Sequence, residues 1–186
     1  MKSGQPAVIG VVSVGKIGTL VARIVAASIQ GILDTPVDIL GEIDVPEESF
    51  ILERRQYDAG LMLRALEDLS LNHACILGIT NVDLCIPVFT YVFGEAQLGG
   101  KTAIVSTARL HRGEKGEIIS ESLFYERIVK VALHEIGHVF SLYHCENEKC
   151  VMKFSARLDV LDSLPVLFCD RCLFLLRKLT SMQTIP

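Results

Sequence analysis

The sequence of 186 residues has no excess of positive charge. It holds 18 lysines and arginines against 22 aspartates and glutamates, which gives a formal net charge of -4 at pH 7. Proteins that bind nucleic acid normally present a positive field to the phosphate backbone, and this composition supplies none. The composition therefore argues against nucleic acid as a partner.

A hydrophobic run long enough to cross a membrane is also missing. The longest apolar run near the start, residues 7–14, is too short to span a bilayer, and Gly15 and Lys16 follow it where a signal peptide would have its cleavage site. We expect a soluble, unexported, cytoplasmic protein without a membrane partner. Export stays open as the alternative, because Lys2 before a short apolar stretch faintly resembles a signal sequence.

Internal repeats, low-complexity tracts and an inter-domain linker are absent from the sequence as well. A chain of this length can bury one hydrophobic core without cross-links. We therefore expect a single domain over residues 1–186, and the sequence carries no prediction of its oligomeric state.

Strand and helix patterns alternate through the first half of the chain. Short β-branched apolar runs indicate buried strands, and apolar residues recurring every three or four positions indicate helices. The expected order is strand 7–14, helix 19–32, strand 37–40, a charged connection at 46–55, helix 58–69 capped by Asp58, and strand 74–79. This βαβαβ order favours parallel strands with helices on both faces of the sheet.

The second half adds an edge strand and two helices. An extended stretch is expected at 88–93. Over 101–110, one set of side chains (Ala103, Val105, Thr107) alternates with another (Ile104, Ser106, Ala108), which predicts an edge strand. A polar turn at 113–116 precedes a long helix that opens at Ser122, and a last helix is expected over 169–182. The predicted fold class is α/β: a mixed, twisted sheet of parallel strands with one antiparallel edge strand, packed by helices.

Residues 10–17, GVVSVGKI, match a phosphate-binding P-loop except at the last position. A P-loop has serine or threonine after its lysine to ligate magnesium, and Ile17 offers no oxygen. A dinucleotide-binding fingerprint fails as well, because Ser13 stands where its first glycine belongs. We interpret the segment as a tight strand-to-helix turn, with nucleotide binding as the alternative.

Three histidines lie close together in HEIGHVFSLYH, residues 134–144. On a helix, His134 and His138 leave the same face one turn apart and can share one tetrahedral zinc. His144 lies six residues farther on, so the helix has to end and the chain has to turn back. Three neutral histidines leave one coordination position open, as in hydrolytic sites, and Glu135 stands beside the metal as a general base.

Four of the six cysteines lie in the last quarter of the chain, as Cys145-x4-Cys150 and Cys169-x2-Cys172. Two chelating pairs joined by a loop have the spacing of a closed structural zinc site. We therefore expect two zinc ions per chain, the structural one in a C-terminal subregion at 144–186. Two disulfides are the alternative, which would require an oxidising compartment.

The whole pattern resembles the archaemetzincins, a family of zinc metallopeptidases in the metzincin clan. It reads His134-Glu135-x2-His138-x5-His144-Cys145-x4-Cys150-x-Met152-x16-Cys169-x2-Cys172. The resemblance implies a metzincin-like sheet, three histidines on a catalytic zinc, Glu135 as the general base and four cysteines on a second zinc. It also implies that Met152 is the methionine of the turn beneath the catalytic metal.

Two positions depart from the metzincin pattern. Ser141 stands where metzincins usually carry the glycine that lets the zinc helix end in a left-handed turn, a conformation that costs other residues about 1–2 kcal/mol. Lys153 and Phe154 follow Met152, where some metzincins carry a tyrosine directed at the metal.

The expected activity is zinc-dependent hydrolysis of peptide bonds in a peptide or protein substrate. An extended substrate could pair with the expected edge strand at 101–110, as the resemblance implies, although Lys101 and Arg109 could equally guard that edge. The alternative function is a catalytically silent module that binds two zinc ions as a scaffold. An intact Glu135 argues against it, because a structural site needs no base.

Overall fold

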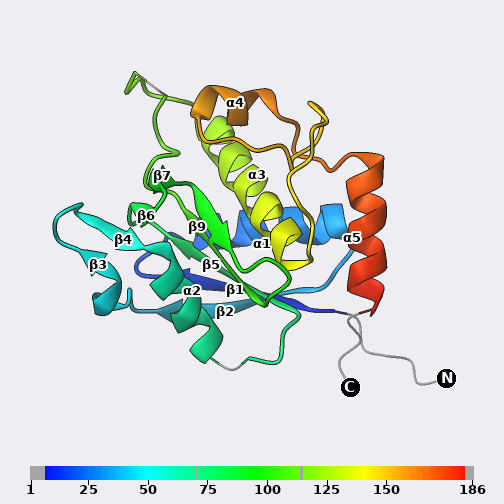
Figure 1. Cartoon of the computed structure of the whole chain (residues 1–186), viewed down its shortest axis with the longest axis horizontal. Coiled ribbons are helices and arrows are strands. Elements are labelled where there is room, and N and C mark those ends of the chain that lie inside the picture. Colours follow the sequence, from blue (N-terminus) through cyan, green and yellow to red (C-terminus); the bar gives the residue numbers. More distant parts are fainter. Residues whose placement is uncertain (1–6, 70, 114, 183–186) are drawn as a thin grey trace.

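The computed structural model describes residues 7–69, 71–113 and 115–182. The main sheet contains, in spatial order, β2 (Val37–Ile43), β1 (Ile9–Val14), β5 (Cys75–Thr80), β9 (Thr102–Ser106) and β8 (Gly94–Ala96) (Figure 1). The first four strands run parallel, and β8 pairs antiparallel with β9 at one edge. The expected fold class is confirmed.

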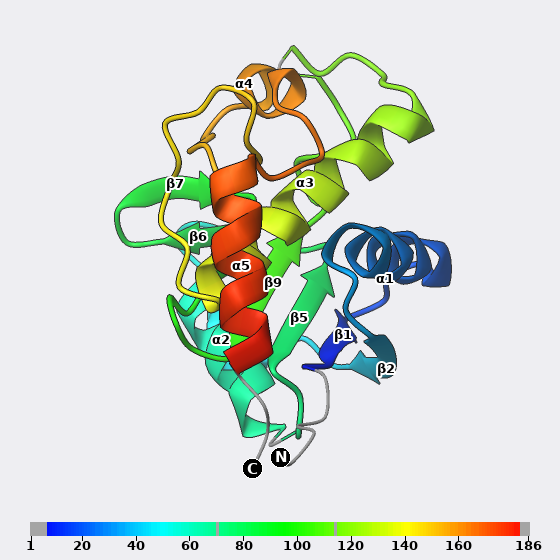
Figure 2. The ribbon, with the colours of Figure 1, turned by 90° about the vertical axis from the view of Figure 1, so that its right-hand side faces the viewer.

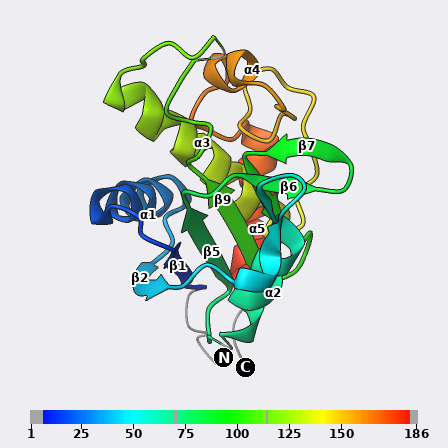
Figure 3. The same ribbon diagram turned by 90° about the vertical axis from the view of Figure 1, so that its left-hand side faces the viewer.

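Helices cover both faces of this sheet. α1 (Thr19–Leu33) and α3 (Glu121–Val139) lie on one face, and α2 (Ala59–Asp68) lies on the other (Figures 2 and 3). Because successive strand residues point to opposite faces, Val11 packs in the core with α1 and α3, whereas Val12 packs in the core with α2. The sheet is therefore buried on both sides, which explains the continuous apolar runs of its central strands.

Two further helices follow α3 in the chain. α4 (Leu158–Ser163) and α5 (Asp170–Met182) contribute Leu161 and Leu176 to the same core as α3. Among the residues that the structure describes, no helix is both long and apolar enough to cross a membrane.

A second, smaller sheet lies beside the main one, and the sequence indicated only its last strand, as the extended stretch at 88–93. Its strands, in spatial order, are β3 (Phe50–Ile51), β4 (Gln56–Asp58), β6 (Leu84–Ile86) and β7 (Phe89–Val92). Strands of two to four residues are too short to show a periodic pattern. The region expected as a charged connection, 46–55, instead contains a short 3-10 helix, η1 (Glu47–Ser49), and β3.

The βαβαβ order of the first half is confirmed. β1, α1, β2, α2 and β5 occur in the predicted sequence, with bounds that differ from the expected ones by up to three residues. Asp58 is the N-cap of α2, and its carboxylate accepts a hydrogen bond from the backbone N–H of Leu61 at 3.0 Å.

The expected edge strand at 101–110 is wrong. Only residues 102–106 form a strand, β9, and it lies between β5 and β8 with all five residues buried. Residues after Ser106 leave the sheet in a turn that Leu110 closes by donating its N–H to the carbonyl oxygen of Thr107 at 3.0 Å. Both faces of β9 are packed against other parts of the protein, and the strand at the edge of the sheet is β8.

The P-loop-like segment, residues 10–17, consists of most of β1 and the turn that follows it. Backbone from Ile9 to Val14 pairs with β2 and β5, and Gly15 takes a φ of 76°, which favours glycine. This arrangement is the tight strand-to-helix turn that the sequence indicated. The sheet hydrogen bonds use the backbone that a phosphate cradle would need.

Candidate metal centres

α3 begins one position earlier than expected and ends just after the second histidine. Ser120 is its N-cap, with a hydroxyl that accepts a hydrogen bond from Leu123 N–H at 3.2 Å. At the other end, Ser141 takes a left-handed conformation with φ of 63°. Its N–H donates to His138 O, and Leu142 N–H donates to Gly137 O, both at 2.9 Å, which together form a Schellman motif.

This turn returns the chain to α3 and brings the three histidines together. The ring centroids of His134, His138 and His144 lie 4.7, 5.3 and 4.9 Å apart. The Nε2 atoms of His134 and His138 are 3.1 Å apart. Two nitrogens bound to one tetrahedral zinc lie about 3.3 Å apart, so this donor set fits a zinc ion.

Backbone carbonyls fix the orientation of the two helical histidines. Nδ1 of His134 donates to the carbonyl oxygen of Val151 at 2.8 Å, and Nδ1 of His138 donates to that of Leu142 at 2.7 Å. Since a carbonyl oxygen can only accept, the hydrogen lies on Nδ1 and the Nε2 lone pair is left for a metal.

Burial keeps the three imidazoles neutral. It lowers the pKa of His134 to about 4, and it also lowers the pKa of His138 and of His144. Neutral histidine is the form that binds a metal ion. At neutral pH the three side chains therefore need not lose a proton before they bind zinc.

Glu135 is a residue of α3, and its side chain packs against Gly94 of the edge strand β8. Only 7% of its surface is exposed, and a Cβ atom built on Gly94 would lie 2.8 Å from its Oε1 atom. Burial, with a smaller contribution from the carboxylate of Glu95, raises the pKa of Glu135 well above its usual value. A bound cation at the histidines would act in the opposite direction.

Met152 is fully buried against the helix that carries the histidines. A Cβ atom on Gly137 would overlap its sulfur and would lie 3.0 Å from its Cε atom. The glycine between the two helical histidines therefore makes room for the methionine side chain.

The four C-terminal cysteines form a second cluster. Their sulfur atoms all lie within 4.8 Å of one another, and those of Cys145 and Cys169 are 3.9 Å apart. Thiolates on one tetrahedral zinc are about 3.8 Å apart, whereas bonded sulfurs are about 2.05 Å apart. All six cysteines, which lie in the described part of the chain, are free thiols.

One loop connects the two clusters. Cys145 N–H donates to the carbonyl oxygen of Met152 at 2.8 Å, which closes the loop that begins directly after His144. Inside this loop Val151 accepts the hydrogen bond from His134, and its own N–H donates to Leu167 O at 2.8 Å. Backbone placed by the cysteine cluster thus also orients a histidine.

A cleft of about 410 Å³ opens over the histidine cluster. Its walls include the three histidines, Glu135 and β8, and also Phe89, Tyr91, Tyr143 and Phe154. Polar donors therefore meet a largely apolar lining that includes several aromatic rings, as is usual in sites that bind small molecules or peptides.

Comparison with known proteins identifies the family. Residues 21–178 match the family model described as peptidase family M54. The chain belongs to this family. It is therefore a zinc metallopeptidase, as the resemblance to the archaemetzincins implied.

Individual relatives of this M54 peptidase agree with that result. The archaemetzincin of Archaeoglobus fulgidus is 38% identical over 81% of this chain and 87% of its own, and that of Methanocaldococcus jannaschii is 39% identical over 73% and 74%. The crystal structure of the Methanopyrus kandleri archaemetzincin superposes with a TM-score of 0.85 at 32% identity, covering 95% of this chain and 97% of that one.

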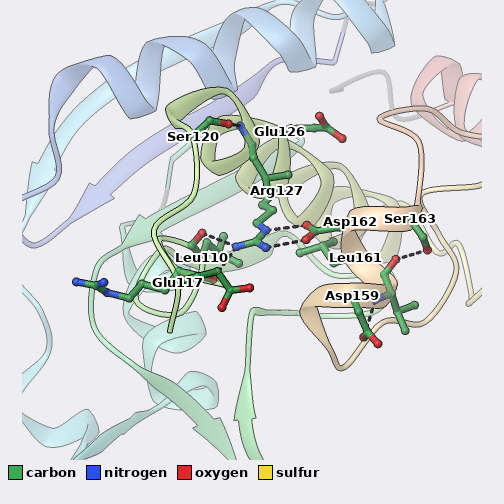
Figure 4. A network of polar contacts seen from close by, with 12 residues as sticks. Leu110, Glu117, Ser120, Glu126, Arg127, Asp159, Leu161, Asp162 and Ser163 are labelled. Carbon is green, nitrogen blue, oxygen red and sulfur yellow. Dashed lines mark hydrogen bonds and ion pairs between the residues drawn. The ribbon is translucent and has the colours of Figure 1, made fainter. Parts of the chain in front are cut away.

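The M54 peptidase has two buried cationic side chains on α3 that were not predicted from the sequence. Arg127, 2% exposed, donates to both carboxylate oxygens of Asp162 at 2.7 Å (Figure 4). The same guanidinium donates to the carbonyl oxygens of Leu110 and Arg112 at 3.0 and 2.8 Å. It therefore joins α3 to α4 and to the loop after β9.

Lys130 is the second buried cation, one helical turn before His134. Its ammonium forms an ion pair with Glu126 at 2.6 Å and donates to the carbonyl oxygens of Leu161 and Asp162 at 3.1 and 3.3 Å. Its three hydrogens thus meet three acceptors. Both cations lie among apolar positions of α3, and the sequence alone does not show that α4 supplies several of their partners.

The other histidines of the M54 peptidase lie outside the metal clusters. His73 contacts Asp38 with its Nε2 atom at 3.2 Å, and the ring of His111 stacks on Phe124 with centroids 4.1 Å apart. Neither histidine has metal-binding spacing in the sequence, and neither belongs to a metal-binding group in the described part of the chain.

Proposed function

We propose that His134, His138 and His144 bind the catalytic zinc and that Glu135 is the general base in peptide-bond hydrolysis. The observation that carries this proposal is the convergence of three neutral imidazoles and one buried carboxylate on a single cleft. When bound, zinc supplies Lewis acidity, which makes water more acidic and polarises the carbonyl group to be cleaved.

Glu135 moves the proton in this mechanism. Its carboxylate takes a proton from the attacking water and passes it to the nitrogen of the departing amine. Burial stabilises the protonated carboxyl, so the group holds the proton between the two steps. Met152 supplies an apolar floor beneath the histidines and takes no part in proton transfer.

The second part of the proposal is a structural zinc at Cys145, Cys150, Cys169 and Cys172, which gives two zinc ions per chain. Four thiolates fill a tetrahedral ion and leave no position for water. The separation of the sulfur atoms supports this assignment.

We propose that an extended substrate pairs with β8, in place of the 101–110 edge that the sequence suggested. Ser106 N–H donates to Phe93 O at 2.8 Å and Gln97 N–H donates to Thr102 O at 3.0 Å. Because hydrogen bonding alternates along an antiparallel strand, the N–H and C=O groups of Gly94 and Ala96 point away from β9. These groups are the ones that a substrate strand would use.

Hydrolysis by the wild type and by Glu135→Gln, compared at equal zinc content, tests the proposal. We expect cleavage of a peptide library by the wild type and a loss of at least about 100-fold in kcat in the variant. Equal rates above background would remove Glu135 as the base, and no hydrolysis above background by either protein would favour the scaffold alternative. Library members with blocked and free amino ends would also separate aminopeptidase from endopeptidase action.

A further inference from the structure

Two exposed phenylalanines stand beside the third histidine. The ring of Phe154 lies 5.0 Å from that of His144 and 6.1 Å from that of Phe89, measured between centroids. Phe154 is 50% exposed and Phe89 is 41% exposed, and both line the cleft. Phe89 and Phe154 are called the aromatic wall below.

Arg54 fixes the hairpin that carries Phe89. From the turn after β3, its guanidinium donates to the carbonyl oxygens of Phe89, Thr90 and Ile86 at 2.7, 2.8 and 3.3 Å. A planar guanidinium that meets three carbonyls holds the backbone between β6 and β7 in one conformation. From the sequence, Arg54 was expected in a charged connection at 46–55.

A polar relay extends from Arg54 along the smaller sheet. Arg54 Nε donates to Gln56 Oε1 at 3.0 Å, and Gln56 Nε2 donates to Asp83 at 2.8 Å. Asp83 in turn accepts two hydrogen bonds from Arg109, both at 2.6 Å. Charge-assisted and bidentate contacts of this kind are strong and directional.

The relay ends at the segment that carries Phe154. The guanidinium of Arg109 lies 4.2 Å above the ring of Tyr91, and the hydroxyl of Tyr91 donates to the carbonyl oxygen of Ala156 at 3.1 Å. The two halves of the aromatic wall, 65 residues apart in the chain, are thus held by one set of contacts. Arg109 is exposed, but its guanidinium is held by Asp83 and Tyr91, and it does not guard a strand edge.

We propose that the aromatic wall is a subsite for a large apolar side chain next to the bond that is cleaved, and that Arg54 is a positioning residue for it. This inference rests on the proposed function. Rigidly held, exposed aromatic rings in a cleft bind apolar groups by burial and stacking. Both lysines that line the cleft are paired, Lys130 with Glu126 and Lys153 with Glu148, so neither supplies an unpaired cation for an acidic side chain.

Peptides that differ only in one residue beside the scissile bond test the subsite. That residue would be Phe, Leu, Ala or Glu, placed on either side of the bond in turn. On one side, we expect kcat/KM for the Phe peptide to exceed that for the Ala peptide by about 10-fold or more, mainly through KM. Equal values for Phe, Ala and Glu on both sides would overturn the proposal.

Variants show which residues produce the preference for phenylalanine over alanine. Phe89→Ala and Arg54→Ala should bring the ratio of kcat/KM for the Phe peptide to that for the Ala peptide below about 3-fold, and Phe89→Leu should keep most of the ratio. Arg64→Ala, an exposed arginine of α2, is the matched control and should leave the ratio unchanged. A full ratio in both Phe89→Ala and Arg54→Ala would overturn the assignment of these residues.

Peptide affinity separates this inference from the proposed function. Zinc-loaded Glu135→Gln should bind the Phe peptide about 10-fold more tightly than the Ala peptide in a calorimetric titration, and Phe89→Ala in that background should remove the difference. If the wild type cleaves nothing but this difference is seen, the subsite stands and the peptidase mechanism fails. Equal affinities would contradict the subsite whether or not hydrolysis occurs.

Discussion

Nδ1 of His134 donates a hydrogen bond to the carbonyl oxygen of Val151, the residue that directly follows Cys150. A histidine of one metal cluster is therefore oriented by backbone that a cysteine of the other cluster anchors. The hydrogen bond between Cys145 N–H and Met152 O closes the same loop. The histidines should consequently bind zinc at full affinity only when the cysteine cluster holds this loop in place.

Cys172→Ala tests this coupling. We expect loss of the structural zinc and, because the loop that bears Val151 loosens, weaker retention of zinc at the histidines by about 10-fold or more. Zinc content after dialysis against graded chelator measures it. Cys85→Ala, at a buried cysteine in β6, is the control and should retain both ions. Full retention of the catalytic zinc in Cys172→Ala would contradict the coupling.

Gly94→Ala tests the packing of β8 against the base. The added methyl group would lie 2.7 Å from Cγ and 2.8 Å from Oε1 of Glu135, so the carboxylate has to move. We expect kcat to fall about 10- to 100-fold with zinc content unchanged. Gly31→Ala, with nothing within 4 Å of the new Cβ atom, should keep wild-type kinetics. Wild-type kcat in Gly94→Ala would show that the carboxylate tolerates displacement.

Ser141→Gly tests the cost of the left-handed turn. Glycine adopts the observed φ of 63° without strain, so the substitution should raise the free energy of unfolding by about 0.5–1 kcal/mol. Ser141→Ala removes the hydroxyl and keeps the strained φ, and it should bring no gain. Urea unfolding of the three zinc-loaded proteins gives the comparison, and equal stabilities would mean that serine pays no penalty here.

Arg127→Met tests the buried ion pair between α3 and α4. It leaves Asp162 and two backbone carbonyls without their partner, and we expect a loss of about 3 kcal/mol in the free energy of unfolding. Arg157→Met removes a surface arginine that pairs with Asp159 and should cost at most about 0.5 kcal/mol. Similar losses in the two variants would show that burial does not set the strength of the Arg127 pair.

The sequence predicts the parts of this protein that are local in the chain. His134 and His138 share a helix face because of their spacing, and the βαβαβ order follows from runs long enough to show a period. The edge strand was misplaced because both faces of β9 are buried, so the position of its side chains along the strand does not show which face is exposed. Single-domain organisation and a cytoplasmic location stay predictions.

Contacts between segments far apart in the chain could not be predicted from the sequence. Arg54 meets carbonyls more than 30 residues away, and Arg127 meets a carboxylate 35 residues away. Each arginine has the same local sequence signal as a solvated one, because only the packed fold brings its acceptors close. Nor do strands as short as β3 and β4 show a recognisable pattern.

Zinc content per chain tests the central claim most directly. Protein prepared without chelator and then supplied with excess zinc should hold two tightly bound ions after desalting, measured by elemental analysis. The double variant His134→Ala, His138→Ala should keep one of them, because the cysteine cluster stays intact. A single bound ion in the replenished wild type would contradict the assignment of an open histidine site beside a closed cysteine site.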